Sequence, residues 1–387
     1  MLKIDIIIPS FKKSPKYQKF QKFQTYSFPS LIGSWFPVWY NKNILRKMGV
    51  KVNFINFFQV NFDKLSNIVG FDSRIIGNIL SNYGTVKETT INAIIPMLKK
   101  IRKKANHIVY FDNGDSSGYT QFEVLPYVDR YFKKQILKDK TIYSKFLYRK
   151  RLFTDYYFKN YHLEEEGSNL PLYPIKPEFE RKIGISWNFA FKDYRSSNKI
   201  DKYLFAFSRL QNLKFFEPNK NRKLLFSANY SIKTGSSIID FQRKELLNFL
   251  EKNYSINDNI SLGRIPKKLY LKTMRSSKAI FSPFGWGEIC YRDFEILISG
   301  AALIKPDMAH LETWPNIYKK FKTYIPISWK IEDWEHEVPK ILDNEDLLLD
   351  VAINGQNQYK KYWTKNGRSV FCERFIDLIT PNCLNFS

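Results

Sequence analysis

One segment of the chain, residues 277–307, combines residue types that could hold a negatively charged ligand. Gly285 and Gly287 lack side chains, so a ligand could approach the backbone closely at this turn. A helix that begins just after them would point free N–H groups and the positive end of its dipole at the same place. On that helix, Arg292 and Glu295 are three residues apart and share a face. The guanidinium can hold phosphate oxygens and the carboxylate can accept hydrogen bonds from a ribose diol, so the segment suits a diphosphate carried on a ribose.

The elements predicted around these residues place them at one edge of a sheet. The strand AIFSPFG (279–285) leads into the glycine turn, a helix follows near residues 289–299, and the strand AALIKPD (301–307) comes next. In parallel α/β sheets, ligands bind outside the carboxyl ends of the strands, which is where this turn would lie. A tight turn followed by an intrahelical salt bridge explains the same residues without a ligand, and the sequence leaves both interpretations open.

Four further polar residues could contact the same ligand. Ser227 and Asn229 end or follow the strand predicted at residues 223–227 and would face the same cleft. Arg264 and Lys278 could neutralise a leaving diphosphate, stabilising charge that grows in the transition state. Ordinary surface charge is the alternative interpretation of these two basic residues.

Residues 261–350 resemble the donor-binding region of GT-B-fold glycosyltransferases, in particular the group-1 and exostosin-like families. The shared pattern is a glycine-containing turn (Phe284-Gly285), a helix with Glu295, then Gly300 and an apolar strand. The resemblance implies that Glu295 binds the ribose of a nucleotide sugar and that Arg292 lies near its phosphates. It also implies two Rossmann-like domains whose parallel sheets face a cleft.

Glu288 is a further donor-binding candidate by resemblance. The group-1 families often carry a pair of glutamates in this region, but at a spacing one residue longer than that from Glu288 to Glu295, and Gly287 occupies the matching position. The role of the first glutamate therefore does not transfer directly to Glu288. Neither an inverting nor a retaining outcome is predicted.

An inverting transfer would need a base to deprotonate the acceptor hydroxyl. The loop at residues 112–118 follows the predicted strand HIVYF and offers Asp112 and Asp115. In a GT-B enzyme this N-terminal side belongs to the acceptor. A glycine-containing loop rich in Asp and Asn is also typical of a simple turn.

The length of 387 residues and the order of the elements predict two α/β domains. Short apolar strands alternate with helices, as in residues 3–9, 50–58 and 90–111. A polar stretch near residue 220 marks the boundary. We expect an acceptor-side Rossmann-like domain at 1–215 and a nucleotide-sugar domain at 222–387. By resemblance, the last helix returns to the first domain.

The net charge of +25, from 62 Lys+Arg against 37 Asp+Glu, suggests an anionic partner. One basic stretch, residues 133–151, is interleaved with Tyr143, Phe146 and Tyr148. It could bind phosphate or anionic lipid, or it could be a solvated face with inward-pointing aromatic residues. A bias toward A/T-rich codons, which encode lysine, explains part of the lysine excess without any binding role.

The chain shows no sign of a bound metal or a membrane span. Its three cysteines and four histidines have no metal-ligand spacing. No DxD pair stands in a convincing place, so we expect no cofactor and no essential metal. The N-terminus reads as a strand, and no apolar run is long enough to cross a membrane. We expect a cytoplasmic protein, with peripheral attachment to the inner membrane face as a further possibility.

The expected function is transfer of a sugar from a nucleotide-diphosphate sugar to a surface-glycan acceptor, such as lipopolysaccharide, capsule or a glycoprotein glycan. The acceptor could be lipid-linked, and no specific nucleic acid is expected as a partner. One alternative is a basic nucleic-acid-binding protein without catalysis. Its affinity for nucleic acid would fall steeply with salt and would not change in Glu295→Ala. Another is a nucleotide-sugar epimerase on the same fold, which would convert the donor without an acceptor.

Overall fold

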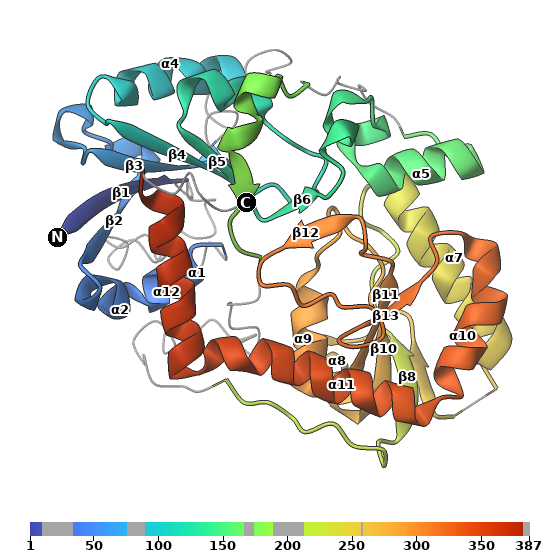
Figure 1. The fold of residues 1–387 in the computed structure, drawn as a ribbon. Coiled ribbons are helices and arrows are strands. Elements are labelled where there is room, and N and C mark those ends of the chain that lie inside the picture. Colours follow the sequence, from blue (N-terminus) through green and yellow to red (C-terminus); the bar gives the residue numbers. More distant parts are fainter. Residues whose placement is uncertain (10–33, 76–89, 166–173, 189–212, 257, 382–387) are drawn as a thin grey trace, which may run out of the picture.

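A computed structural model describes residues 1–9, 34–75, 90–165, 174–188, 213–256 and 258–381. Its first sheet contains six strands, and every neighbouring pair in it is parallel (Figure 1). The sheet order is β2-β1-β3-β4-β5-β7. The strands are β1 (Leu2–Ile8), β2 (Val50–Asn56), β3 (Ile68–Asp72), β4 (His107–Asp112), β5 (Arg130–Lys133) and β7 (Ile183–Ile185).

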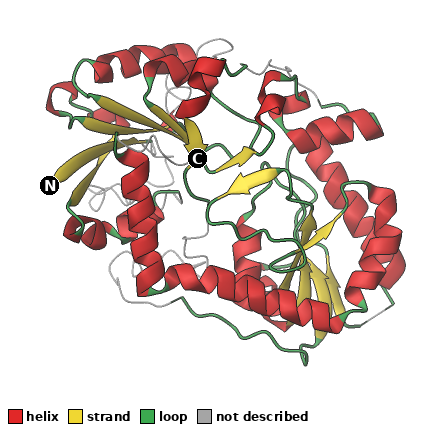
Figure 2. Cartoon of the chain, in the orientation of Figure 1, coloured by secondary structure: helices red, strands yellow, loops and turns green. Residues whose placement is uncertain are grey.

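The second sheet contains five parallel strands in the order β13-β11-β10-β8-β9. These are β8 (Leu224–Ala228), β9 (Ile260–Leu262), β10 (Ser277–Phe281), β11 (Ala302–Pro306) and β13 (Ile325–Ile327). The helices of this half are α7 (Ser237–Tyr254), α8 (Lys267–Ser276), α9 (Tyr291–Ser299), α10 (Trp334–Leu342) and α11 (Glu345–Lys360). Figure 2 shows these helices around the second sheet.

Continuous apolar runs build both sheets, as expected for parallel strands covered on two faces. In β1, the last five residues are buried, including Ile4, Ile6 and Ile8. All five residues of β11 are buried as well. The helices of the first half are α1 (Phe36–Tyr40), α2 (Lys42–Lys47), α4 (Thr90–Arg102) and α5 (Leu152–Tyr161).

Several elements connect the two halves. A two-stranded antiparallel sheet pairs β6 (Gln135–Leu137) with β12 (Leu311–Thr313), one strand from each half. Helix α5 follows strands β1 to β6 in sequence but packs on α7 (Figure 1). The last helix, α12 (Lys365–Ile379), lies against α1 and α2, where Arg368 Nε donates to Asn41 Oδ1 at 2.7 Å.

The fold class is the predicted one: α/β, with two parallel sheets whose carboxyl ends face each other, which is the GT-B arrangement. Local predictions differ in detail. The helix expected near residue 289 begins at Tyr291, because Cys290 is its extended N-cap. In the basic stretch, Tyr143 and Tyr148 are buried, as the inward-pointing interpretation expected, whereas Phe146 is 53% exposed. Within the described residues, no helix has the length and apolar character to cross a membrane.

Candidate functional site

The candidate site lies where the strand order of the second sheet reverses. Strands β8 and β10 are neighbours, with β9 on the far side of β8 and β11 on the far side of β10. The chain therefore leaves these two strands in opposite directions, and in open α/β sheets ligands bind at the carboxyl ends of such a pair of strands. Asn229 follows β8, and the turn with Gly285 and Gly287 follows β10. The topology thus brings together two segments that the sequence analysis selected separately.

Arg292 and Tyr230 form the centre of this site. The guanidinium carbon lies 5.3 Å from the centre of the Tyr230 ring, within the range of a cation–π contact. The Arg292 atoms Nε and Nη1 and the Tyr230 hydroxyl are all inaccessible to solvent, and none has a hydrogen-bond partner within the described part of the chain. Burial raises the pKa of Tyr230, so this hydroxyl stays protonated and can donate.

Two predicted residues of β8 and its following loop add further polar atoms. Ser227 and Asn229 are buried, and Ser227 Oγ and Asn229 Oδ1 also lack partners among the described residues. The Asn229 amide is fixed by donation to Ser261 Oγ at 3.2 Å and to the Gly263 carbonyl at 2.9 Å. Because buried polar groups are nearly always hydrogen-bonded, such a group of unpaired atoms favours a ligand site.

Arg243 is a site residue that the sequence analysis missed. It projects from α7, and its Nε donates to the Phe284 carbonyl while Nη1 donates to the Ser231 carbonyl, each at 2.8 Å. It therefore ties the loop after β8 to the turn after β10. A Cβ at Gly285 would lie 3.2 Å from Arg243 Nη2, so the glycine lets this guanidinium approach. A single arginine on a helix gives no signal in the sequence that separates it from surface charge.

Glu295 lies on α9 and contacts α8. Its Oε2 accepts a hydrogen bond from the Tyr270 hydroxyl at 2.8 Å, which fixes the carboxylate beside Arg292. The nearby Asp293 is fully buried and serves the structure: it accepts from Ser282 Oγ at 2.6 Å and lies 3.3 Å from Lys305 Nζ. The two carboxylates and the one guanidinium on this helix, Asp293, Glu295 and Arg292, thus have distinct environments.

The two predicted basic residues, Arg264 and Lys278, lie at different distances from the unpaired polar atoms of Arg292, Tyr230 and Asn229. Arg264 is exposed, two residues after β9 and next to Gly263, whose carbonyl accepts from Asn229. Lys278 stands at the amino end of β10, the opposite end from the glycine turn, and its Nζ lies 2.5 Å from Glu345 Oε1. The structure therefore gives Lys278 a surface ion pair and places it away from the predicted diphosphate site.

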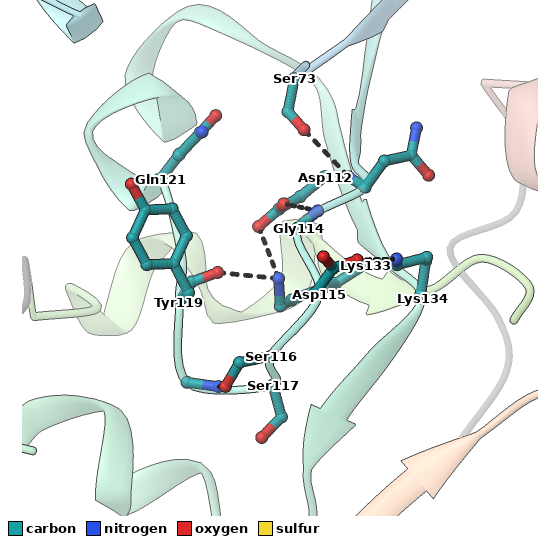
Figure 3. Close-up of polar contacts among 12 residues, drawn as sticks. Ser73, Asp112, Gly114, Asp115, Ser116, Ser117, Tyr119, Gln121, Lys133 and Lys134 are labelled. Carbon is teal, nitrogen blue, oxygen red and sulfur yellow. Dashed lines mark hydrogen bonds and ion pairs between the residues drawn. The ribbon is translucent and has the colours of Figure 1, made fainter. Parts of the chain in front are cut away.

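On the side of the first sheet, Asp112 is completely buried (Figure 3). Its Oδ2 accepts from the Tyr131 hydroxyl and from Lys133 Nζ at 3.0 Å, and its Oδ1 accepts from the Gly114 backbone at 2.8 Å. Lys133 is itself buried and also donates to the Tyr119 carbonyl. These bonds occupy the carboxylate, so a structural role fits Asp112 and proton transfer to a ligand does not.

Asp115 has the opposite environment. Its side chain is 62% exposed, and Oδ1 lies 3.1 Å from Lys134 Nζ (Figure 3). Burial of its surroundings would raise the pKa of this carboxyl, but Lys134, Lys133 and Arg74 outweigh that effect and lower it. Asp115 is therefore an ionised, accessible carboxylate at the carboxyl edge of the first sheet.

Glu288 and Gly287 form the contact between the two halves. Glu288 is fully buried, and its carboxylate accepts from the backbone N–H and the hydroxyl of Ser117, in the loop after β4. A Cβ on Gly287 would lie only 1.7 Å from the carbonyl oxygen of Asp115. Both residues were predicted to bind the donor, but the structure uses them to join the glycine turn to the loop of residues 112–118.

The polar and aromatic residues after β11 have mixed environments. Glu312 pairs with Ile136 in the β6–β12 ladder, and the Trp314 ring packs on Phe371, so both have structural roles. His310 packs against Trp329 at 4.9 Å, and burial lowers its pKa. Across the residues that the structure describes, no group of three or more His, Cys, Asp or Glu side chains could hold a metal ion.

Comparison with protein-family models gives no match, and comparison with curated proteins gives none either. Solved structures give matches along most of the chain at low identity. HepE from Anabaena in complex with UDP-glucose is 8% identical with a TM-score of 0.40, covering 97% of this chain and 99% of that one. An alpha-glucosyltransferase in complex with UDP and a 13-mer DNA is 11% identical with a TM-score of 0.45, covering 98% and 99%. Sucrose-phosphate synthase from Thermosynechococcus elongatus is 8% identical with a TM-score of 0.41, covering 97% and 98%.

Proposed function

We propose that this chain is a glycosyltransferase that moves a sugar from a nucleotide-diphosphate sugar to a surface glycan. The observation that carries the proposal is the set of unpaired polar atoms on Arg292, Tyr230 and Asn229 at the carboxyl ends of β8 and β10. These atoms include both donors and acceptors, as a nucleotide sugar requires. The resemblance of residues 277–307 to the donor-binding region of GT-B enzymes supports the same assignment.

Each part of the donor has a matching group. Arg292 and Arg243 supply positive charge for the diphosphate, and Arg243 lies against Gly285 in the turn after β10. Glu295, held by Tyr270, would accept hydrogen bonds from the ribose diol. Because the two arginines can stabilise the leaving diphosphate, we propose that the reaction needs no essential metal.

Asp115 is the proposed base if the reaction inverts. Its carboxylate is ionised and accessible, and the loop that carries it contacts the glycine turn through Gly287. A base must reach the acceptor hydroxyl beside the donor, and this position next to the turn supports that role. Asp112 is not proposed as the base, because its carboxylate is already engaged by Lys133 and Tyr131.

The decisive experiment is a thermal-shift screen of the full chain against UDP, GDP, CDP and ADP sugars. We expect one nucleotide to raise the melting temperature, and we expect Arg292→Gln and Glu295→Ala to remove the effect. Lys278→Gln is the matched control, since Lys278 lies at the other end of β10 and should leave the shift intact. If no nucleotide sugar stabilises the wild-type chain, the proposal is wrong. Turnover of the donor in the absence of any acceptor would instead favour an epimerase.

The acceptor proposed is lipopolysaccharide, capsule or a glycoprotein glycan, reached at the inner face of a membrane. Exposed Lys138, Lys140, Lys145 and Phe146 on the 133–151 stretch support contact with anionic lipid. Each well-placed basic residue contributes about 1 kcal/mol to such contact. Co-sedimentation with vesicles tests the proposed membrane contact. The bound fraction of the protein should rise with the fraction of anionic lipid, and binding that does not depend on anionic lipid would contradict the proposal.

A further inference from the structure

Two exposed aromatic side chains lie where the facing edges of the sheets meet. Trp286, between Gly285 and Gly287 in the turn after β10, is 46% exposed, and Tyr119, in the loop after β4, is 45% exposed. These two segments are already joined by the Glu288–Ser117 contact. Large aromatic side chains that remain exposed beside a cleft are typical of a binding surface.

A basic side chain accompanies each of these rings. Arg151 lies with its guanidinium carbon 5.0 Å from the centre of the Trp286 ring, and its Nε donates to the Trp286 carbonyl at 3.1 Å. Lys150 Nζ lies 5.5 Å from the centre of the Tyr119 ring. Neither cation has an ion-pair partner among the described residues. Their charge therefore remains available to an anionic group.

The backbone is strained at Lys150 and at the residue before it. Arg149 and Lys150 both have left-handed conformations, with φ of 55° and 57°, which side-chain-bearing residues rarely adopt. An ion pair from Arg149 Nε to Glu165 Oε2 at 3.1 Å anchors the segment, and Glu165 in turn accepts from the Ile238 backbone at the start of α7. Such strain persists where surrounding contacts enforce it, and it clusters at functional sites.

The nearby acids do not cancel this positive charge. Glu165 is engaged by Arg149 and the α7 N-terminus, and Glu288 is engaged by Ser117. Glu123 acts electrostatically on Lys150 without forming an ion pair with it among the described residues; burial raises the pKa of Glu123 and lowers that of Lys150. The surface formed by Tyr119, Lys150, Arg151 and Trp286 is therefore aromatic and positively charged. We call these four residues the rim site.

We propose that the rim site binds an acidic saccharide, with sugar rings stacked on Trp286 and Tyr119 and carboxylate or phosphate groups bound by Arg151 and Lys150. The apolar C–H face of a pyranose suits an aromatic ring, and an anionic substituent suits a guanidinium. Because the rim site adjoins the glycine turn, this saccharide would be the acceptor, and that assignment rests on the proposed function. The proposal narrows the acceptor from surface glycans in general to acidic ones.

The test is calorimetric titration of the full chain, without nucleotide, with a tetramer of galacturonic acid and a tetramer of glucose. We expect the acidic tetramer to bind at least about tenfold more tightly than the neutral one. We also expect Trp286→Leu and Arg151→Gln each to weaken the binding of the acidic tetramer by about tenfold. Phe321→Leu and Arg46→Gln are the matched controls, because they change an exposed aromatic residue and an exposed arginine elsewhere.

The outcomes separate this proposal from the proposed function. Equal affinity for both tetramers, no binding of either, or full binding by both rim variants would overturn the rim site. Binding of anionic vesicles that both rim variants lose, with no saccharide binding, would assign the residues to lipid and overturn it as well. The thermal shift by a nucleotide sugar should survive in both rim variants, since it depends on Arg292 and Glu295. If that shift is absent but the acidic tetramer binds, the donor assignment fails and the saccharide site stands.

Discussion

The carboxylate of Glu288 accepts hydrogen bonds from the backbone N–H of Ser117 at 3.0 Å and from its hydroxyl at 2.6 Å, joining two loops that are 171 residues apart. Both residues are completely buried. The contact links the turn after β10 to the loop after β4, so it holds the carboxyl edges of the two sheets together. Glu288 thus organises the candidate site without contributing to the unpaired cluster around Arg292.

We expect Glu288→Ala to destabilise the chain, because it leaves the Ser117 N–H and hydroxyl buried without an acceptor. The free energy of unfolding should fall by about 2–4 kcal/mol. Chemical denaturation measures this change. Glu288→Gln keeps one acceptor oxygen and should lose less, whereas the exposed Glu335→Ala should change stability by no more than about 0.5 kcal/mol. Equal stability of Glu288→Ala and wild type would show that the contact contributes nothing.

Tyr230→Phe should separate ligand binding from stability. The Tyr230 hydroxyl is buried without a partner in the described residues, so its removal should leave the melting temperature unchanged or slightly higher. Affinity for the nucleotide sugar should fall by about three- to tenfold, the equivalent of one hydrogen bond. Titration calorimetry and a melting curve on the same protein give both values.

Tyr131→Phe is the contrasting variant. The Tyr131 hydroxyl donates to Asp112 and accepts from the Gln121 backbone at 3.0 Å, so its loss should cost about 1–3 kcal/mol of stability. Its effect on nucleotide affinity should be small, because it belongs to the first sheet. A Tyr230→Phe variant that loses stability like Tyr131→Phe would mean that the Tyr230 hydroxyl serves the fold.

The sequence predicted the second sheet and its glycine turn well, because those features are local. Gly285, Arg292 and Glu295 lie along one strand–turn–helix unit, as their spacing predicted. Tyr230 and Arg243 were missed because neither belongs to a local motif: one follows β8, and the other reaches the turn from α7. Only the strand order of the folded sheet makes them neighbours.

Long-range pairing also explains why the sequence could not show the structural contacts of Glu288 and Asp112. A glutamate in a glycine turn suits a ligand site until its partner Ser117 is known, and an aspartate after a strand suits a base until Lys133 is known. The sequence also could not show the surroundings of Lys278. Lys278 comes shortly before the glycine turn in the chain, so a place near the diphosphate was plausible. It lies at the amino end of β10, however, whereas the turn follows the carboxyl end.

Asp112→Asn should act mainly on stability and Asp115→Asn mainly on turnover. Asp112→Asn leaves the buried Lys133 without a counter-charge and should lower stability by about 3–5 kcal/mol. Asp115→Asn also removes the ion-pair partner of a buried lysine, Lys134, but the Asp115 carboxylate is 62% exposed and burial already lowers the pKa of Lys134 to about 8, so stability should fall less than in Asp112→Asn. Turnover should drop by about a hundredfold or more if Asp115 is the base. Near-normal turnover by a folded Asp115→Asn variant would remove this residue from the mechanism, and donor binding should persist in it.

The last prediction concerns the pH dependence of stability through Lys134. Burial lowers the pKa of this side chain from 10.5 to about 8, a change that Asp115 partly opposes and that Arg74 and Lys133 reinforce. Between these two pKa values, the unfolded chain binds a proton that the folded chain does not, so stability rises with pH across this window. At about 1.4 kcal/mol per unit, the contribution of Lys134 approaches 3 kcal/mol between about pH 7 and 10.

The Lys134→Met variant cannot show this rise of stability with pH, because methionine carries no titratable proton. Denaturation of both proteins at a series of pH values should therefore give a difference, wild type minus variant, that rises by about 3 kcal/mol as the pH increases through the window. The buried tyrosines, whose pKa values burial raises, are present in both proteins, so they cancel in this difference. Lys138→Met, which removes an exposed lysine near the end of β6, should run parallel to wild type. A Lys134→Met curve that also runs parallel would mean that Lys134 keeps its proton in the folded chain, with Asp115 compensating fully for burial.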